Sequence, residues 1–295
     1  MQIHLAVGVD RRYLTPLKVA LVSLADQLGP RAQPVLHLVH RSLLADDVAA
    51  IDPRFEVRPI TPDAALVDRI SRHPRLPPET AFPLLLPEVL RDLDRVIFLD
   101  ADILVLADVT PLWELDLRGC AVAAAPDGAI QKCSDRRGLA EWKALGIPAD
   151  TVYFNGGVLV MDLGAWRDRD VTERALSYLR DSAFTAEFLH QEAINAVLSD
   201  DRLLLDQRWN VLGAAARRQA ERARRPWIVH FAGRIKPWLA PIGGPYEATY
   251  RELLRRLEIS RPVPDRKTRA RSLYDRYLRP VTYPLEHAVW SRGWL

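Results

Sequence analysis

The stretch "IHLAVGV" at residues 3–9 is a nearly continuous apolar run with the length of a strand buried on both faces. Residues 16–29 follow with apolar side chains at helical spacing, a proline at the start and a glycine at the end. A second strand-like run, "PVLHLVH", occupies residues 34–40. This β-α-β opening predicts parallel strands that helices cover on both faces.

The same alternation continues along the chain. We expect further strands at 55–60, 95–99, 120–125, 156–163 and 226–233, and further helices at 79–93, 193–200 and 244–259. The sequence therefore predicts an α/β fold with a mostly parallel, Rossmann-like sheet flanked by helices. We expect one domain over residues 1–259 and a C-terminal extension over residues 260–295.

The composition is that of a soluble globular protein, with 295 residues, of which 48% are hydrophobic and 27% charged. No apolar run approaches the roughly 20 residues that cross a bilayer, and the N-terminus lacks the basic segment of a secretion signal. Cys120 and Cys133 lack metal-ligand spacing and favour a reducing compartment. We therefore expect a cytoplasmic protein.

The net charge of +3 comes from an excess of Arg and Lys in residues 260–295. Aromatic residues accompany them, among them Tyr274, Tyr277, Tyr283, Trp290 and Trp294. Basic groups can meet anionic lipid headgroups while aromatic rings lie in the interface, which predicts peripheral attachment to the inner membrane face. The alternative is an extension that packs on its own domain or on a second subunit, as in a homodimer. No nucleic-acid partner is expected, because the charge is confined to one end.

Two carboxylates, Asp100 and Asp102, end the apolar run in "RVIFLDADILV" at residues 95–105. Asp10 follows the first strand, and ligands bind outside the carboxyl ends of parallel strands, so all three are expected to face one crevice. Two like charges at one point repel each other unless a cation lies between them. Hard oxygen ligands suit Mn²⁺ or Mg²⁺ shared with a substrate's phosphates. A turn or a helix cap also produces Asp-x-Asp, so the pair alone leaves both interpretations open.

A second polar set, "HFAGRIKPW", follows the last predicted strand at residues 230–238. The imidazole of His230 can complete a metal shell, Gly233 lets the backbone approach a phosphate, and Lys236 offers a point charge. A buried histidine and a surface lysine without a ligand are the alternative for either residue alone.

Together these segments resemble the family 8 glycosyltransferases, retaining enzymes of GT-A fold that include lipopolysaccharide galactosyl- and glucosyltransferases and glycogenin. The resemblance covers roughly residues 3–240. It is carried by "VDRRY" at 9–13, "FLDADILVLADVTPLWELDL" at 98–117, "YFNGGVLVMDL" at 153–163, "HQEAINAVL" at 190–198 and the segment from His230 to Trp238.

The resemblance implies a metal-dependent retaining hexosyltransferase that moves a hexose from a nucleotide sugar, a UDP-sugar by preference, to an acceptor that the sequence does not identify. It implies that Asp100, Asp102 and His230 hold Mn²⁺ or Mg²⁺ against the diphosphate. The implied donor-binding residues are Val7, Gly8, Val9, Asp10, Tyr13, Ala101, Asp127, Asn155, Gly156, Gly157, His190, Gly233 and Lys236. Among them, Asp10 and Tyr13 would bind the base.

The implied catalytic residues are Gln191, beneath the anomeric carbon, and its neighbour Glu192. An amide is a poor nucleophile, so we expect front-face attack with Gln191 stabilising positive charge. Glu192 is the carboxylate that a covalent route would use. The alternative for both is a structural role at a helix N-terminus, where they complement the dipole.

Three positions depart from the family pattern. Pro83 replaces the usual arginine, His190 replaces an acidic residue that accepts hydroxyl hydrogen bonds, and Arg12 replaces a common asparagine. Pro83 and His190 keep open a non-catalytic sugar-nucleotide-binding or membrane-docking protein of the same fold. A haloacid-dehalogenase-like phosphatase is a further alternative, although Ile103 and Leu104 stand where such enzymes usually carry Gly-Thr.

Overall fold

The computed structural model describes residues 1–71, 78–181, 189–212, 225–232, 236–241 and 245–262. The chain forms two compact units, Met1–His230 and Phe231–Leu295. The boundary expected at residue 259 stays a prediction, and the basic, aromatic extension lies outside the described residues from 263 onward.

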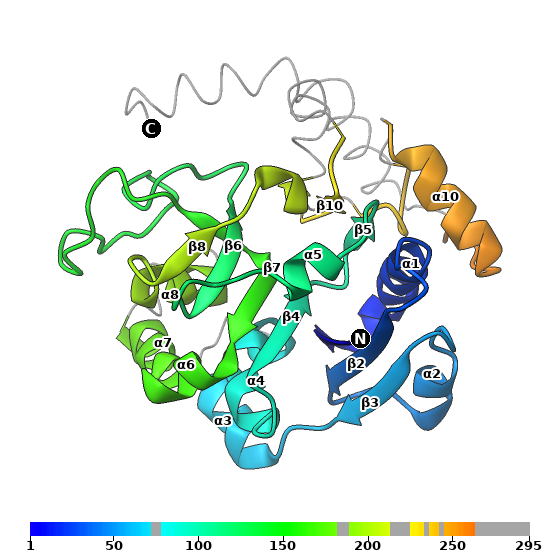
Figure 1. Ribbon diagram of the computed structural model, residues 1–295, viewed down its shortest axis with the longest axis horizontal. Helices are drawn as coiled ribbons and strands as arrows, with labels where there is room; N and C mark the ends of the chain where they lie inside the picture. The colour runs from blue at the N-terminus through cyan, green and yellow to red at the C-terminus, as the bar shows by residue number, and fades with distance from the viewer. Residues whose placement is uncertain (72–77, 182–188, 213–224, 233–235, 242–244, 263–295) are drawn as a thin grey trace. The chain divides into compact units, whose positions relative to one another are not determined.

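A seven-stranded sheet with the order β3-β2-β1-β4-β7-β6-β8 forms the centre of the first unit (Figure 1). Its strands are β1 (Gln2–Val9), β2 (Gln33–His40), β3 (Glu56–Ile60), β4 (Arg95–Leu99), β6 (Val122–Pro126), β7 (Phe154–Asp162) and β8 (Arg202–Leu204). Strand β7 runs antiparallel to its neighbours β4 and β6, and the other described pairings of this sheet are parallel. The predicted α/β class with a mostly parallel sheet is confirmed.

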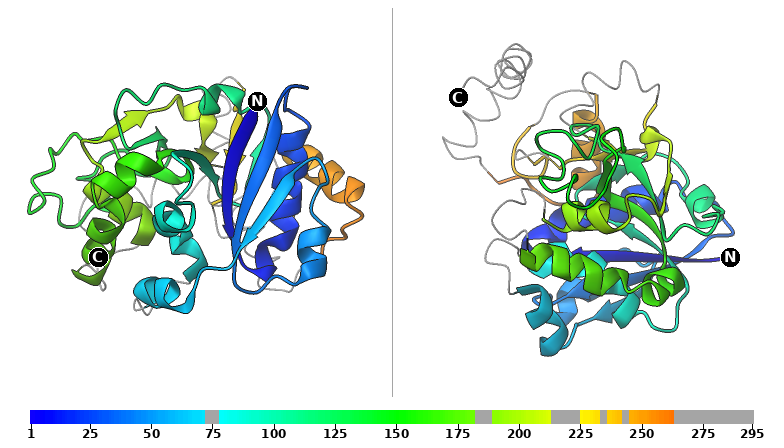
Figure 2. Two further views of the ribbon diagram at one scale, coloured as in Figure 1. Left: turned by 60° about the horizontal axis from the view of Figure 1, so that its bottom comes forward. Right: turned by 90° about the vertical axis from the view of Figure 1, so that its left-hand side faces the viewer.

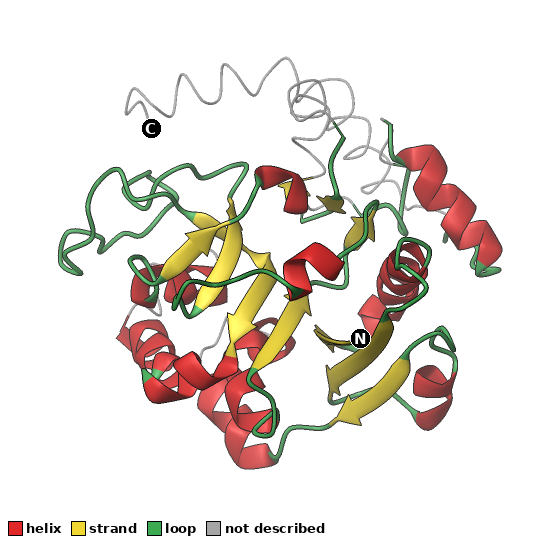
Figure 3. Cartoon of the chain, in the orientation of Figure 1, coloured by secondary structure: helices red, strands yellow, loops and turns green. Residues whose placement is uncertain are grey.

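Helices surround this sheet (Figure 3). The α-helices of the first unit are α1 (Leu14–Ala25), α2 (Ala45–Ala49), α3 (Ala64–Ser71), α4 (Phe82–Val89), α5 (Thr110–Trp113), α6 (Leu163–Asp168), α7 (Val171–Asp181) and α8 (Leu189–Val197). Short 3-10 helices are η1 (Arg11–Tyr13), η2 (Pro78–Ala81) and η3 (Gln207–Trp209). The helix expected at 79–93 is divided between η2 and α4, because Pro83 suits the first turn of a new helix.

Both faces of the sheet are buried, as the apolar strands predict. Val96 and Phe98 of β4 belong to one core cluster, with α4, α6, α7 and α8. Ile97 and Leu99, the alternate residues, belong to a second cluster with α1 and α5. The left view of Figure 2 shows α1 on one side of strand β1 and the cyan and green helices α4, α6 and α7 on the other. The strand ends are therefore held by packing from two sides.

A small second sheet decides where the polar residues lie. It has the order β5-β10-β9, with β5 (Ile103–Val105), β10 (Ile228–His230) and β9 (Val211–Leu212). Strand β10 pairs antiparallel with β5 and parallel with β9. The sequence predicts β10 as part of the longer run expected at 226–233. It predicts neither β5 nor β9, because their two or three residues carry no readable period.

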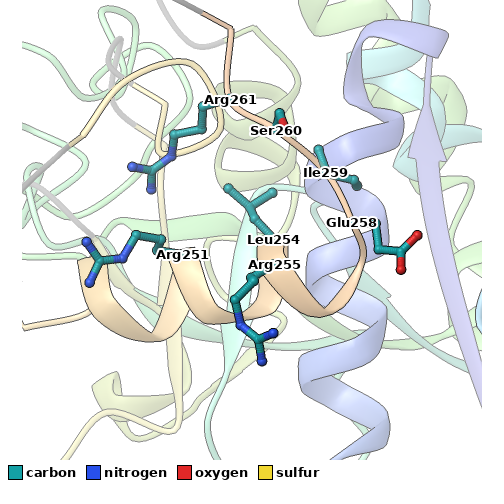
Figure 4. Close-up of a pocket in the computed structure, with 7 residues that line it drawn as sticks. All are labelled: Arg251, Leu254, Arg255, Glu258, Ile259, Ser260 and Arg261. Carbon is teal, nitrogen blue, oxygen red and sulfur yellow. The ribbon is translucent and has the colours of Figure 1, made fainter.

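The second unit contains α10 (Glu247–Arg256), close to the helix expected at 244–259. Tyr250 of this helix meets Phe231 edge-on, with the ring centroids 5.4 Å apart. Figure 4 shows a hollow at the end of α10, lined by Arg251, Leu254, Arg255, Glu258, Ile259, Ser260 and Arg261. Within the described part of the chain, no helix has the length and apolar character to span a bilayer.

Candidate metal and donor site

Asp100 and Asp102 lie on the tight connection between the two sheets. The backbone N–H of Asp100 donates to the carbonyl of Gly157 at 2.8 Å, which extends the β4–β7 ladder by one residue. Strand β5 of the second sheet begins directly after Asp102. The Asp102 side chain is 9% exposed and that of Asp100 is 32% exposed. The fold therefore fixes one carboxylate in the interior and leaves the other partly open.

His230 reaches these carboxylates through strand pairing. In the β5–β10 ladder His230 lies opposite Ile103, the residue after Asp102. Its Nε2 atom lies 3.3 Å from Asp100 Oδ2 and 3.3 Å from Asp102 Oδ1. The ligand atoms of the three side chains lie within 4.8 Å of one another.

The ligand atoms of these three side chains fit the implied metal ion. Atoms about 3 Å apart can surround a cation at the roughly 2.1 Å that Mg²⁺ requires, and two carboxylate oxygens with one imidazole nitrogen suit Mn²⁺ equally. The three residues predicted from strand ends as metal ligands thus lie together.

Gly157 lies against this cluster so closely that no side chain fits. A Cβ atom at this position would lie 2.4 Å from His230 Cε1 and 2.6 Å from Asp100 Oδ2. Real Cβ atoms do not approach other atoms to such distances. At the neighbouring Gly156 the closest atoms to a Cβ would be 3.6 Å away, an ordinary contact. Of these two adjacent glycines, only Gly157 must lack a side chain for the cluster to keep its geometry.

A line of side-chain amides leads away from His230. Its Nδ1 atom lies 3.1 Å from Oδ1 of Asn210, and Nδ2 of Asn210 donates to Oδ1 of Asn155 at 2.8 Å. Asn155 also accepts from the N–H of Gly157 at 2.9 Å, and it donates to Oδ2 of Asp127 at 2.8 Å. The metal-ligand cluster is therefore connected by hydrogen bonds to residues of β7 and of the loop after β6.

Gln191, in the first turn of α8, ends this line. Its Nε2 donates to Asp127 Oδ2 at 3.2 Å, and its Oε1 accepts from the N–H of Gly156 at 2.9 Å. Asn195, one turn later, donates to the carbonyl of Gln191 and binds both backbone groups of Phe154. Glu192 is 2% exposed. The structure thus brings Asp127, Asn155, Gly156, Gly157 and Gln191 together, although the sequence places them in three separate segments.

His190 borders the same site. Its Nε2 atom would lie 3.6 Å from a Cβ on Gly156. Burial, followed by the proximity of His230, lowers the pKa of His190 to about 4. The position therefore carries a neutral imidazole near pH 7.

The segment predicted to bind the base lies at the same edge of the sheet, since β1 and β4 are parallel neighbours. Asp10 caps η1, accepting from the backbone N–H groups of Arg12 and Tyr13, and forms an ion pair with the exposed Arg12 side chain. Val7 and Val9 are buried in the core, as is Ala101 between the two carboxylates. A Cβ on Gly8 would meet Phe82 at 2.9 Å. Binding of a base here stays a prediction.

Two further predicted residues belong to the second unit. Gly233 lies outside the described residues. The ammonium of Lys236 donates to the carbonyl of Phe231 at 2.8 Å and lies 5.6 Å from the ring centroid of Trp238. Their contact with a diphosphate stays a prediction.

Sequence reasoning missed Asn210. A single polar residue between Trp209 and Val211 was the available signal, because a buried polar side chain next to apolar neighbours needs hydrogen-bond partners. Asn195 lies within a segment quoted for its likeness to the family, yet its contacts with β7 became apparent only in the structure.

Comparisons with known proteins agree with the observed fold. The model of glycosyl transferase family 8 matches residues 74–241. General stress protein A of Bacillus subtilis (strain 168) is 25% identical over 272 residues, which cover 84% of this chain and 91% of that protein. Lipopolysaccharide 1,2-glucosyltransferase of Escherichia coli (strain K12) is 27% identical over 161 residues, which cover 50% of this chain and 44% of that protein.

Solved structures give the same picture of the fold. The crystal structure of galactosyltransferase LgtC in complex with donor and acceptor sugar analogs superposes with a TM-score of 0.73 at 20% identity, covering 92% of this chain and 99% of that one. The range that the family model matches includes Asp100, Asp102 and His230.

Proposed function

The chain belongs to glycosyl transferase family 8, and from this premise we propose that it is a metal-dependent retaining hexosyltransferase that uses a UDP-sugar donor. The observation that carries the proposal is the cluster of Asp100, Asp102 and His230, joined by hydrogen bonds to Asn155, Asp127 and Gln191. Membership of this family, with the GT-A fold, removes the phosphatase alternative.

In this proposal Asp100, Asp102 and His230 hold Mn²⁺ or Mg²⁺. When bound, the ion supplies Lewis-acid stabilisation of the departing nucleoside diphosphate. The protein positions the ligands beforehand, because Asp102 and His230 are buried and anchored by neighbouring strands. The more exposed Asp100 places the open side of the cluster toward an incoming donor. Preorganised ligands of this kind lower the cost of assembling the reacting complex.

The sugar would lie against Gly156, Asn155 and Asp127. Asp127 accepts two backbone N–H groups, from Ala129 and Ile130, with one oxygen and two side-chain amides with the other. Its orientation is therefore fixed before any ligand binds. All four acceptor positions of this carboxylate are engaged, so a sugar hydroxyl would bind Asp127 by replacing one of the two side-chain amides.

Gln191 would stabilise the transition state electrostatically. Both ends of its amide are engaged, which fixes Oε1 beside the N–H of Gly156. A carbonyl oxygen so oriented places partial negative charge near a positively charged anomeric carbon, whereas an amide is a weak nucleophile. The acceptor would therefore attack from the face that the leaving group departs from, and the product would retain the configuration of the donor. Glu192 is the residue that a covalent route would require.

Donor turnover tests this function directly. Release of nucleoside diphosphate is measured for a panel of UDP- and GDP-sugars with Mn²⁺, with EDTA, and with EDTA followed by excess Mn²⁺. We expect one UDP-sugar to be hydrolysed or transferred, EDTA to abolish the reaction and Mn²⁺ to restore it. The anomeric proton of the product should show the configuration of the donor.

Two substitutions test whether the activity depends on the metal-ligand cluster. Asp102→Asn should lower activity by more than the about 10- to 100-fold that loss of an outer partner of a metal ligand costs. Asp94→Asn, at the other end of β4 with an exposed side chain, should retain wild-type activity. If no donor is turned over or bound, the enzyme proposal fails. Donor binding without turnover would instead favour the non-catalytic sugar-nucleotide-binding protein.

A further inference from the structure

Asn210 contacts the metal-ligand cluster from behind, on the side of His230 that faces away from the carboxylates. We propose that Asn210 is a positioning residue, which selects the His230 tautomer whose Nε2 lone pair faces Asp100 and Asp102 and so sets the metal affinity of the site. The inference rests on the proposed function, because it assumes that the cluster binds a divalent cation.

The backbone N–H of Gly157 fixes the orientation of the Asn155 side chain. The N–H of Gly157 is a backbone group, so the Asn155 atom that it contacts at 2.9 Å must be the oxygen. The Asn210 atom that contacts this same oxygen at 2.8 Å must then be the NH₂ group. The other end of Asn155 agrees, since its NH₂ donates to a carboxylate oxygen of Asp127. The orientations of both amides therefore follow from a single backbone hydrogen.

The oxygen of Asn210 consequently faces His230. It lies 3.1 Å from Nδ1, and an amide oxygen can only accept, so Nδ1 carries the proton. A neutral imidazole with the proton on Nδ1 has its lone pair on Nε2, the atom 3.3 Å from both carboxylates. A partner that fixes the second nitrogen of a ligating histidine orients the ring and raises its basicity.

The backbone holds Asn210 in place for this role. Its N–H donates to the carbonyl of Gln207, the first residue of η3, and Val211 begins β9 directly afterwards. In the β9–β10 pairing His230 lies opposite Leu212, two residues beyond Asn210, so the two side chains project to the same face. The Asn210 residue is completely buried. Its amide therefore has no solvent partner that could replace His230 or Asn155.

The test measures Mn²⁺ affinity of the full chain by the loss of the electron paramagnetic resonance signal of free Mn²⁺. Asn210→Leu keeps the approximate volume and removes both polar atoms, and it should raise the Kd for Mn²⁺ by about 10- to 100-fold. Asn210→Asp retains an acceptor toward Nδ1 and should bind Mn²⁺ no more weakly than the wild type. The readout requires no catalytic turnover.

Asn195→Leu is the matched control. Asn195 is equally buried and makes three hydrogen bonds, all of them with Phe154 and Gln191 rather than with His230. It should lower the melting temperature while leaving the Mn²⁺ Kd unchanged. Asp102→Asn completes the set as the variant that removes a ligand.

The possible results distinguish failure of the proposed metal site from failure of the inference about Asn210. If the wild type binds no Mn²⁺, or if Asp102→Asn binds as the wild type does, the metal centre itself is refuted. If those two behave as expected and Asn210→Leu binds Mn²⁺ like the wild type, only the inference about Asn210 is overturned. If Asn210→Leu does not fold, Asn210→Asp decides, because a loss of affinity in that variant contradicts selection by an acceptor.

Discussion

Strands β4 and β7 form one antiparallel ladder whose two ends have opposite characters. Along Val96–Leu99 and Val158–Met161 the paired residues are apolar and almost completely buried. One step further, where Asp100 pairs with Gly157, the neighbouring side chains are carboxylates, amides and an imidazole. The apolar half supplies rigidity, and the polar half uses that rigidity to hold groups within hydrogen-bonding distance.

The two halves respond to change in different ways. Apolar packing is non-directional and depends on buried area and volume, so a substitution there lowers the free energy of unfolding. Hydrogen bonds and metal ligation depend on direction and on distances of a few tenths of an ångström. A substitution in the polar half should therefore alter binding and activity before it alters the stability of the fold.

The largest effect is expected from Gly157→Ala. The new methyl group would displace His230 and Asp100 together, and a misplacement of about 1 Å at one group already costs roughly 100-fold in rate, so we expect at least about a 1,000-fold loss of activity. Mn²⁺ affinity should fall as well. Gly156→Ala is the control, because its methyl group has ordinary contacts and Mn²⁺ affinity should persist. Equal Mn²⁺ affinities in the two variants would remove the distinction between these glycines.

An intermediate effect is expected from Leu159→Ala in the apolar half. Leu159 is fully buried between Phe98 and Ala124, so truncation should lower the free energy of unfolding by about 2–5 kcal/mol in urea titrations. The folded fraction should bind Mn²⁺ with wild-type affinity. Leu145→Ala, at an exposed position, should change stability by less than about 0.5 kcal/mol. A large change in Mn²⁺ affinity for Leu159→Ala would show that the halves are not separable.

A smaller effect, on the free energy of unfolding, is expected from His37, a buried polar residue within β2. His37 is buried, with its Nε2 atom 2.9 Å from Nδ1 of His4, and burial followed by His4 lowers its pKa to about 4. The unfolded chain, with an ordinary histidine pKa of 6.5, gains a proton on acidification that the folded chain does not. Stability is therefore full above the unfolded pKa, falls as the pH decreases toward 4, and is lower by about 2 kcal/mol at about pH 5 than at about pH 7.5.

His37→Gln removes this titration. Unfolding in urea at the two pH values should show a smaller difference between them for the variant than for the wild type. An unchanged difference would mean that other groups cause the acid sensitivity.

Local sequence features predicted the strands that form the rigid half. Runs such as "RVIFL" are long enough to be recognised as strands. Because neighbouring parallel strands end at the same edge of a sheet, Asp10, Asp100 and Asp102 were expected at one edge. Likeness to a family added Asp127, Asn155 and Gln191, which no local pattern would have grouped. The contact between His230 and Asp102 depends on a pairing of two three-residue strands far apart in the chain. Asn210 depends on a two-residue strand, and such pairings have no local signature.

The β5–β10 pairing has a consequence for the order of folding. It joins residue 103 to residue 230, so the metal ligands come together only when the intervening chain has already closed a very long loop. Contacts of such large sequence separation form late, after the loop entropy has been offset by packing elsewhere. A cation that binds the three ligands would favour the completed first unit over every partly folded form. Acquisition of metal affinity during refolding should therefore coincide with the last step of folding and report that the chain through His230 has reached its native arrangement.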